Sequence, residues 1–110
     1  MGDEIHSDLW GPAPVETINR KQYFISFTDD YSRYTNIYFL STKDETFNFY
    51  RIYEAWLSTQ YKVHIKNLRS DRGGEYLSEE FSDHLKKAGT MRRLTVHDTP
   101  EHNGVAEHLN

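Results

Sequence analysis

Residues 22–40 read QYFISFTDDYSRYTNIYFL, and this stretch decides the fold. Its two halves, 22–28 and 34–40, are rich in aromatic and β-branched residues, which is typical of β-strands. The segment 29–33 between them is short and polar, so we expect the two strands to form an antiparallel hairpin. A further short strand is predicted at Ile5–Trp10, before a break that reads Gly-Pro-Ala-Pro at 11–14. The N-terminal part therefore predicts a three-stranded meander.

After Leu40 the pattern alternates between helix and strand. Thr42 and Glu45 resemble a capping box, and apolar residues then recur at three- and four-residue spacing. This pattern predicts a helix that runs to about Tyr61. Residues 62–68 alternate, which indicates a strand that ends just before Asp71.

The C-terminal part continues the same alternation. Ser78 is a candidate N-cap of a second helix, and Gly89 suits its left-handed C-terminal position. We expect a strand over 91–96, a loop over 97–103 and the start of a helix at 104–110, truncated where the sequence stops. The order predicts one α/β domain over residues 1–110, a mixed five-stranded sheet flanked by helices.

Composition excludes several classes of protein. The 110 residues include no Cys, which excludes a disulfide framework and a Cys-based zinc site. No apolar run approaches the ~18 residues of a membrane span, and the first six residues are too polar for a signal peptide. We therefore expect an intracellular chain with no membrane partner. The net charge of −4 argues against nucleic-acid binding, but binding depends on local charge, and bound metal ions neutralise carboxylates.

Three polar motifs hold the candidate chemistry. They are HSDLWGP at 6–12, LRSDRGGEY at 68–76 and TPEHNGVAE at 99–107, and they contain Asp8, Asp71 and Glu107. Attack on a phosphodiester needs an activated oxygen nucleophile and a stabilised leaving oxygen. Two divalent ions about 3.5–4 Å apart provide both, and Mg²⁺ prefers carboxylate oxygens. These acids are therefore candidate metal ligands for phosphoryl chemistry.

The motifs, together with DDYSRY at 29–34, resemble the catalytic core of copia-type retrotransposon integrases. In that family 35 residues characteristically separate the last two acids, as they do between Asp71 and Glu107. The resemblance implies a ribonuclease-H-like fold and a polynucleotidyl transferase or endonuclease that joins retrotransposon DNA ends to target DNA. It also implies two Mg²⁺ or Mn²⁺ ions, with Asp8 contacting both and Asp71 and Glu107 each holding one.

The resemblance implies partners as well. DNA is the expected substrate, the nucleus is the expected location, and family members act as homo-oligomers or as part of a larger polyprotein. The candidate nucleic-acid contacts are Arg72, His102, Asn103 and Gly104. Three further arginines are equally open to phosphate contact or to ordinary surface charge: Arg69, Arg92 and Arg93.

Two other acidic groups have structural interpretations. Glu75 is a rival acid that we interpret as a turn residue, beside glycines 73 and 74 that permit a tight turn or positive φ. Asp29 and Asp30 are expected to cap the hairpin turn, with Arg33 as a structural ion-pair partner.

Two functions remain open on the sequence alone. The first is an integrase core that retains its metal site and its enzymatic activity. The alternative is a truncated retrotransposon remnant that folds or binds nucleic acid without catalysis. The acidic triad favours the first by ancestry, whereas the short C-terminal helix and the acidic charge balance favour the second. A ribonuclease-H-type nuclease would share the fold and the metals, but the acid spacing favours the integrase branch.

Overall fold

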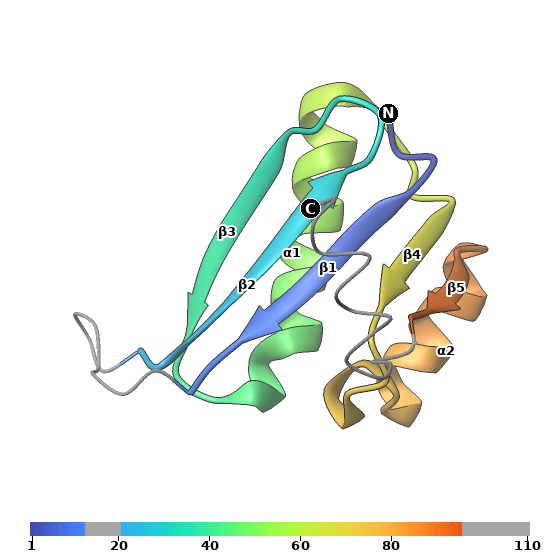
Figure 1. Ribbon diagram of the computed structural model, residues 1–110. Helices are drawn as coiled ribbons and strands as arrows, with labels where there is room; N and C mark the ends of the chain where they lie inside the picture. Colours follow the sequence, from blue (N-terminus) through green and yellow to red (C-terminus); the bar gives the residue numbers. More distant parts are fainter. Residues whose placement is uncertain (13–20, 96–110) are drawn as a thin grey trace, which may run out of the picture.

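A five-stranded mixed sheet organises the computed structural model, which describes residues 1–12 and 21–95 (Figure 1). The spatial order of the strands is β3-β2-β1-β4-β5. The first three strands pair antiparallel, whereas β4 pairs parallel with both β1 and β5. The bounds are β1 Ile5–Trp10, β2 Tyr23–Asp29, β3 Thr35–Leu40, β4 Asn67–Ser70 and β5 Met91–Leu94. This order confirms the predicted mixed five-stranded sheet.

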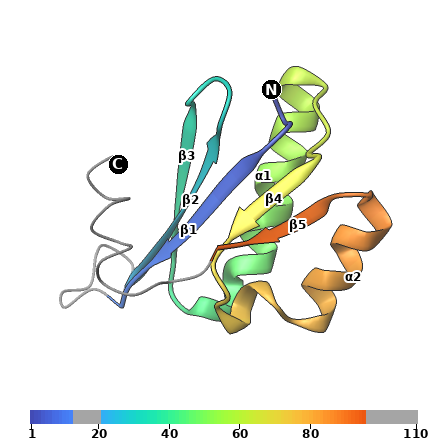
Figure 2. The same cartoon turned by 45° about the vertical axis from the view of Figure 1, so that its right-hand side comes forward.

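Two helices pack on the same face of the sheet, α1 (Thr46–Tyr61) and α2 (Glu79–Ala88), as Figure 1 and Figure 2 show from two directions. Aromatic contacts join the layers. The Phe27 ring on β2 stacks on Tyr53 of α1 at 4.7 Å, and Tyr50 of α1 lies 5.0 Å from Phe81 of α2. Neither of these described helices is long and apolar enough to cross a membrane.

The two faces of the sheet differ in burial because side chains alternate along each strand. On β1, Ile5 and Ser7 are fully buried beneath the helices, whereas His6, Asp8 and Trp10 point to the other face. In the described part of the chain this second face is open. It carries Asp8, and the sheet therefore presents that carboxylate to solvent.

The strand predicted from the alternation at residues 62–68 is shorter in the structure. It begins at Asn67 and not at residue 62. Lys62 adopts φ 57° and ends α1, and the following residues lie against the N-terminus, where Lys66 N–H donates to the Gly2 carbonyl at 2.8 Å. Ile65 is buried there and Val63 partly buried. The alternation at 62–68 thus reports alternate burial and not sheet pairing.

The first helical segment begins at the predicted capping box of Thr42 and Glu45, but its first turn is a 3₁₀ turn and not α-helix. Residues Lys43–Glu45 form a 3₁₀ turn, η2, and α1 begins at Thr46. The Glu45 carboxylate accepts from Ser41 N–H at 2.7 Å and from Thr42 N–H at 3.2 Å, while the Thr42 hydroxyl donates to Asp44. The second helix begins and ends as predicted. The Ser78 hydroxyl accepts from Phe81 N–H at 3.2 Å, and Gly89 has φ 76°.

The hairpin turn is held by Asp29 without the predicted ion pair. The carboxylate of Asp29 is buried and accepts from Gly2 N–H at 2.8 Å and Ser32 N–H at 2.7 Å. Arg33 contributes its backbone N–H to the Asp29 carbonyl at 2.7 Å, and the ion pairs within residues 1–12 and 21–95 do not join these two side chains. The capping role is confirmed for Asp29, and the predicted pairing with Arg33 was wrong.

Candidate active site

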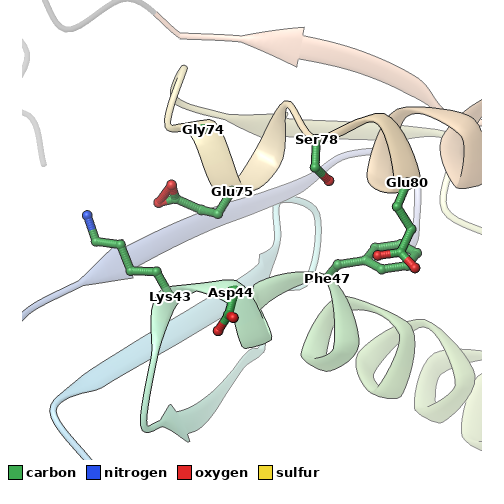
Figure 3. Close-up of a pocket in the computed structure, with 7 residues that line it drawn as sticks. All are labelled: Lys43, Asp44, Phe47, Gly74, Glu75, Ser78 and Glu80. Carbon is green, nitrogen blue, oxygen red and sulfur yellow. The ribbon is translucent and has the colours of Figure 1, made fainter.

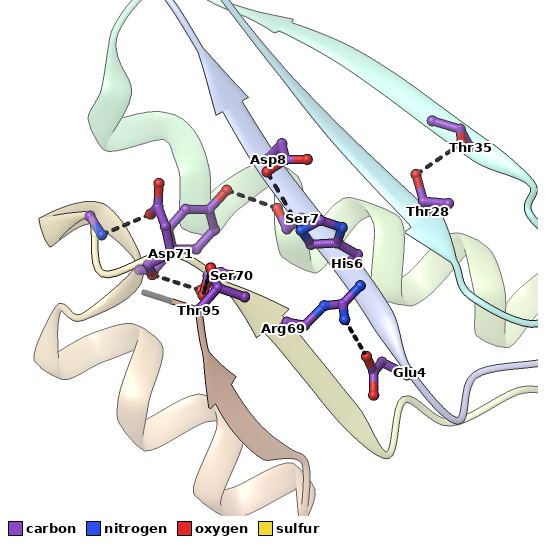
Figure 4. A network of polar contacts seen from close by, with 12 residues as sticks. Glu4, His6, Ser7, Asp8, Thr28, Thr35, Arg69, Ser70, Asp71 and Thr95 are labelled. Carbon is purple, nitrogen blue, oxygen red and sulfur yellow. Dashed lines mark hydrogen bonds and ion pairs between the residues drawn. The ribbon is translucent and has the colours of Figure 1, made fainter. Parts of the chain in front are cut away.

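Asp8 on β1 and Asp71 directly after β4 lie at the same end of two neighbouring parallel strands (Figure 4). The ladder between these strands pairs Ile5 with Leu68 and His6 with Arg69. Each aspartate therefore lies two residues beyond the last pair. The Asp8 side chain is 45% exposed, and its Oδ1 lies 3.6 Å from His6 Nε2. The parallel topology thus brings together two acids that are far apart in the sequence.

The turn after β4 orients the Asp71 carboxylate. Gly73 N–H donates to Asp71 Oδ1 at 2.8 Å, and the Ser70 hydroxyl donates to the Asp71 carbonyl at 3.1 Å. The chain then forms a 3₁₀ turn, η3, over Gly74–Tyr76. Glycines 73 and 74 do not have positive φ, in contrast to Gly2, Gly11 and Gly89 elsewhere in the described residues. The requirement at Gly73 is close approach: a Cβ there would lie 3.0 Å from Asp71 Oδ1 and 2.9 Å from Glu75 Oε1.

Glu75 is a further carboxylate at this end of the sheet. Its Oε1 and Asp71 Oδ1 both lie close to the same point above Gly73, so the two side chains converge. Glu75 also lines a pocket of about 420 Å³ with Lys43, Asp44 and Ser78 (Figure 3). The sequence assigned Glu75 to a turn, and the structure places it both in that turn and beside Asp71.

Ser7 and Tyr76 were not anticipated from the sequence. The Ser7 and Tyr76 hydroxyls form a buried hydrogen bond at 2.8 Å between β1 and η3. Burial raises the pKa of the Tyr76 hydroxyl above its usual range, the Ser7 hydrogen bond lowers it, and the charges of Asp71, Asp8 and Glu75 raise it further. This hydroxyl therefore stays protonated and lies within electrostatic range of all three carboxylates. The available signal was a serine at a buried position of an otherwise apolar strand face.

The integrase core domain model matches residues 2–100 of this chain. The chain belongs to this family. The retrovirus-related Pol polyprotein from transposon TNT 1-94 of Nicotiana tabacum is 41% identical over 108 residues, which cover 98% of this chain and 8% of the polyprotein. The corresponding polyprotein from transposon RE2 of Arabidopsis thaliana is 32% identical over 103 residues, with 94% and 7% covered. The transposon Ty1-DR4 Gag-Pol polyprotein of Saccharomyces cerevisiae is 29% identical over 108 residues, with 96% and 7% covered.

These relatives confirm the resemblance to copia-type retrotransposon integrases. The chain spans less than a tenth of the length of the polyproteins that it matches.

Four arginines of this integrase core lie on or directly after β4 and β5: Arg69, Arg72, Arg92 and Arg93. Arg69 and Arg93 flank Glu4, with nitrogen–oxygen distances of 3.3 and 3.5 Å. Arg72 is exposed next to Asp71, whereas burial lowers the pKa of Arg92 on the covered side. Arg72 is thus available to a phosphate, and Arg69 and Arg93 are engaged with a carboxylate.

Four of the predicted site residues lie outside the described residues: His102, Asn103, Gly104 and Glu107. Their roles stay predictions. Within residues 1–12 and 21–95, no three His, Asp or Glu side chains are grouped so that they could hold a metal ion. The described part therefore supplies Asp8 and Asp71 as two candidate ligands and does not test the third.

Proposed function

We propose that this integrase core binds Mg²⁺ or Mn²⁺ through Asp8, Asp71 and Glu107 and thereby cuts and joins DNA strands. The supporting observation is the placement of Asp8 and Asp71 at the same end of adjacent parallel strands in a chain of the integrase core family. The proposal rests on ancestry for the reaction and on geometry for two of the three ligands.

The two described acids fit a hard divalent cation. Both offer carboxylate oxygens, which are the ligands that Mg²⁺ prefers. The Asp8 side chain is 45% exposed, so an ion that retains several waters can reach it. Two such ions, when bound, would activate the attacking oxygen and stabilise the leaving oxygen of a phosphodiester.

The protein contributes orientation and charge. The Gly73 N–H donor fixes one oxygen of Asp71 before any ligand arrives, which is the preorganisation that a catalytic group needs. Arg72 provides an exposed cation beside that carboxylate for a DNA phosphate. His102, Asn103 and Gly104 complete the proposed DNA contacts. Homo-oligomerisation, a place within a Pol polyprotein and action in the nucleus belong to the same proposal.

The test is a thermal melt of the purified chain with and without Mn²⁺. A ligand that binds only the folded state stabilises it by about 2.7 kcal/mol at a hundredfold excess over Kd. We expect Mn²⁺ to raise the Tm of the wild type but not that of Asp8→Asn or Asp71→Asn. Asp83→Asn, at an exposed position on α2, is the matched control and should respond as the wild type does.

A wild type that folds but ignores Mn²⁺ would support the alternative of a folded remnant without catalysis. If Mn²⁺ raises the Tm of the wild type as expected, an assay of Mn²⁺-dependent joining of a DNA duplex tests the reaction itself. Joining that persists in Asp71→Asn would contradict the proposal. Faster cleavage of an RNA–DNA hybrid than of a DNA branch substrate would indicate a ribonuclease-H-type nuclease instead.

A further inference from the structure

We propose that the hydrogen bond between Ser7 and Tyr76 is a brace that sets the spacing of Asp8 and Asp71. Tyr76 is then a positioning residue of the metal site, and it acts through the turn that carries Asp71. The inference rests on the proposed function, because it concerns the same two carboxylates.

The brace lies where the backbone pairing between the two strands ends. The ladder of β1 and β4 stops at the pair His6–Arg69, and both aspartates come after it. The 2.8 Å bond from Ser7 to Tyr76 joins β1 to η3 beyond that point. Figure 4 labels Ser7 and draws this bond as a dashed line from its hydroxyl. Two nearby carboxylates repel each other, so a connection at this place keeps their supporting segments together.

The aromatic core holds Tyr76 in place. Tyr76 is 1% exposed and Ser7 is fully buried. The Tyr76 ring lies 6.0 Å from Phe81, whose ring lies 5.0 Å from both Phe47 and Tyr50. A buried hydroxyl that loses its partner retains its full desolvation penalty. The ring and the hydroxyl are therefore fixed together, and β1 is tied to the helical layer through them.

Two hydrogen bonds in series connect Tyr76 to the Asp71 carboxylate. Tyr76 N–H donates to the Gly73 carbonyl at 3.0 Å, and Gly73 N–H donates to Asp71 Oδ1 at 2.8 Å. At the other end of the brace, Ser7 is the residue before Asp8 on β1. A shift of Tyr76 thus changes the position of the Asp71 carboxylate relative to Asp8.

The test compares Tyr76→Phe, Ser7→Ala and the double variant with the wild-type chain. Tyr50→Phe is the matched control, since it removes a buried hydroxyl from the same aromatic cluster, and this hydroxyl has no hydrogen-bond partner among the described residues. The first measurement is hydrogen exchange of the Gly73 amide by NMR without metal. The second is the Kd for Mn²⁺, from the dependence of Tm on Mn²⁺ concentration.

We expect Gly73 exchange to become about tenfold faster in both single variants, the effect of one lost hydrogen bond. The Kd for Mn²⁺ should rise about tenfold, as for other groups that orient metal ligands. The double variant should match the single variants, because all three remove the same bond. Tyr50→Phe should change at most the metal-free Tm, and it should leave Gly73 exchange and the Kd for Mn²⁺ unchanged.

Gly73 exchange and Mn²⁺ affinity that stay at wild-type values in Tyr76→Phe and Ser7→Ala would overturn the inference. So would equal effects from Tyr50→Phe, since they would report general loosening of the core. If the wild type itself ignores Mn²⁺, the proposed function fails, and Gly73 exchange still decides the brace: faster exchange only in the Ser7 and Tyr76 variants supports it, and unchanged exchange overturns it. If Tyr76→Phe does not fold, Ser7→Ala gives the same decision.

Discussion

At the scale of single residues, glycine is required at position 73 because neighbouring side chains obstruct a Cβ, and not because the backbone conformation needs glycine. It has φ −57° and ψ 142°, which other residues adopt readily. A Cβ there would lie 2.9 Å from Glu75 Oε1 and 3.0 Å from Asp71 Oδ1, whereas a Cβ at Gly74 would meet nothing within 4 Å. Both obstructing atoms are the ends of side chains that can move. An added methyl group at residue 73 would therefore displace two carboxylates without unfolding the turn.

Gly73→Ala should therefore weaken the proposed Mn²⁺ site while the fold persists. We expect the Kd for Mn²⁺ to rise about tenfold and the metal-free free energy of unfolding to change by at most about 1 kcal/mol. Urea denaturation and Mn²⁺-dependent melts measure the two quantities. Gly74→Ala is the control and should leave Mn²⁺ binding unchanged. Equal Mn²⁺ affinity in both variants would show that the carboxylates near Gly73 do not bind the ion.

Asp29 is a second residue whose role is local and electrostatic. Burial raises the pKa of its carboxyl, but hydrogen bonds from Gly2 and Ser32 outweigh this and hold the pKa below its ordinary value. A carboxyl with a depressed folded pKa stabilises the fold above its unfolded pKa, and that contribution is lost as pH falls through the folded pKa. Asp29 therefore contributes stability at neutral pH that acid removes.

Asp29→Asn should lower the free energy of unfolding at pH 7 by about 1–3 kcal/mol, because one backbone N–H loses its acceptor. It should also flatten the loss of stability below about pH 4, the unfolded pKa range of Asp. Urea denaturation at pH 7 and at acidic pH checks both effects. Asp30→Asn, at the exposed neighbouring position, should change neither. If the loss of stability at acidic pH is as steep in Asp29→Asn as in the wild type, the protonation of another carboxyl causes it.

At the scale of elements, the sequence predicted the helix ends that are set by a cap residue within the same turn. Ser78 and Gly89 bounded α2 because a side-chain N-cap and a left-handed C-terminal glycine act within one turn of the helix. The end of α1 at Tyr61 was also predicted, but from apolar periodicity and not from a cap residue. Lys62 takes the same left-handed conformation with φ 57°, which a non-glycine residue rarely adopts and which the sequence does not mark. Residues 62–66 were misassigned for a related reason, since periodicity reports burial whether or not a strand pairs.

The candidate site divides in the same way. The adjacency of Asp8 and Asp71 followed from recognisable motifs on strands of known order. The Ser7–Tyr76 bond and the approach of Glu75 to Asp71 depend on where side chains meet after folding. A serine within a buried strand face predicts that a polar partner exists, because a buried hydroxyl needs one. The sequence alone does not indicate which residue that partner is.

At the scale of the whole molecule, the two faces of the sheet differ in the described part of the chain: one packs against the helices and the other is open. Ile25 of β2 and Ile37 of β3 lie on adjacent strands, yet Ile25 is fully buried under the helices and Ile37 is 53% exposed. Ile37 is paired with Ser26 and not with Ile25, which places the two isoleucines on opposite faces. Among residues 1–12 and 21–95, apolar burial is thus concentrated on one side of the sheet, and the side that carries Asp8 is exposed.

The same substitution at these two isoleucines tests that division. Ile25→Val should lower the free energy of unfolding by about 1 kcal/mol, because it removes a methylene group from a closed core. Ile37→Val should cost less than about 0.5 kcal/mol, since the side chain is half exposed and valine suits an edge strand equally well. Urea denaturation of both variants gives the comparison. Equal costs would mean that the open face is covered in solution, and Ile37 and its neighbours would then belong to a second packed layer.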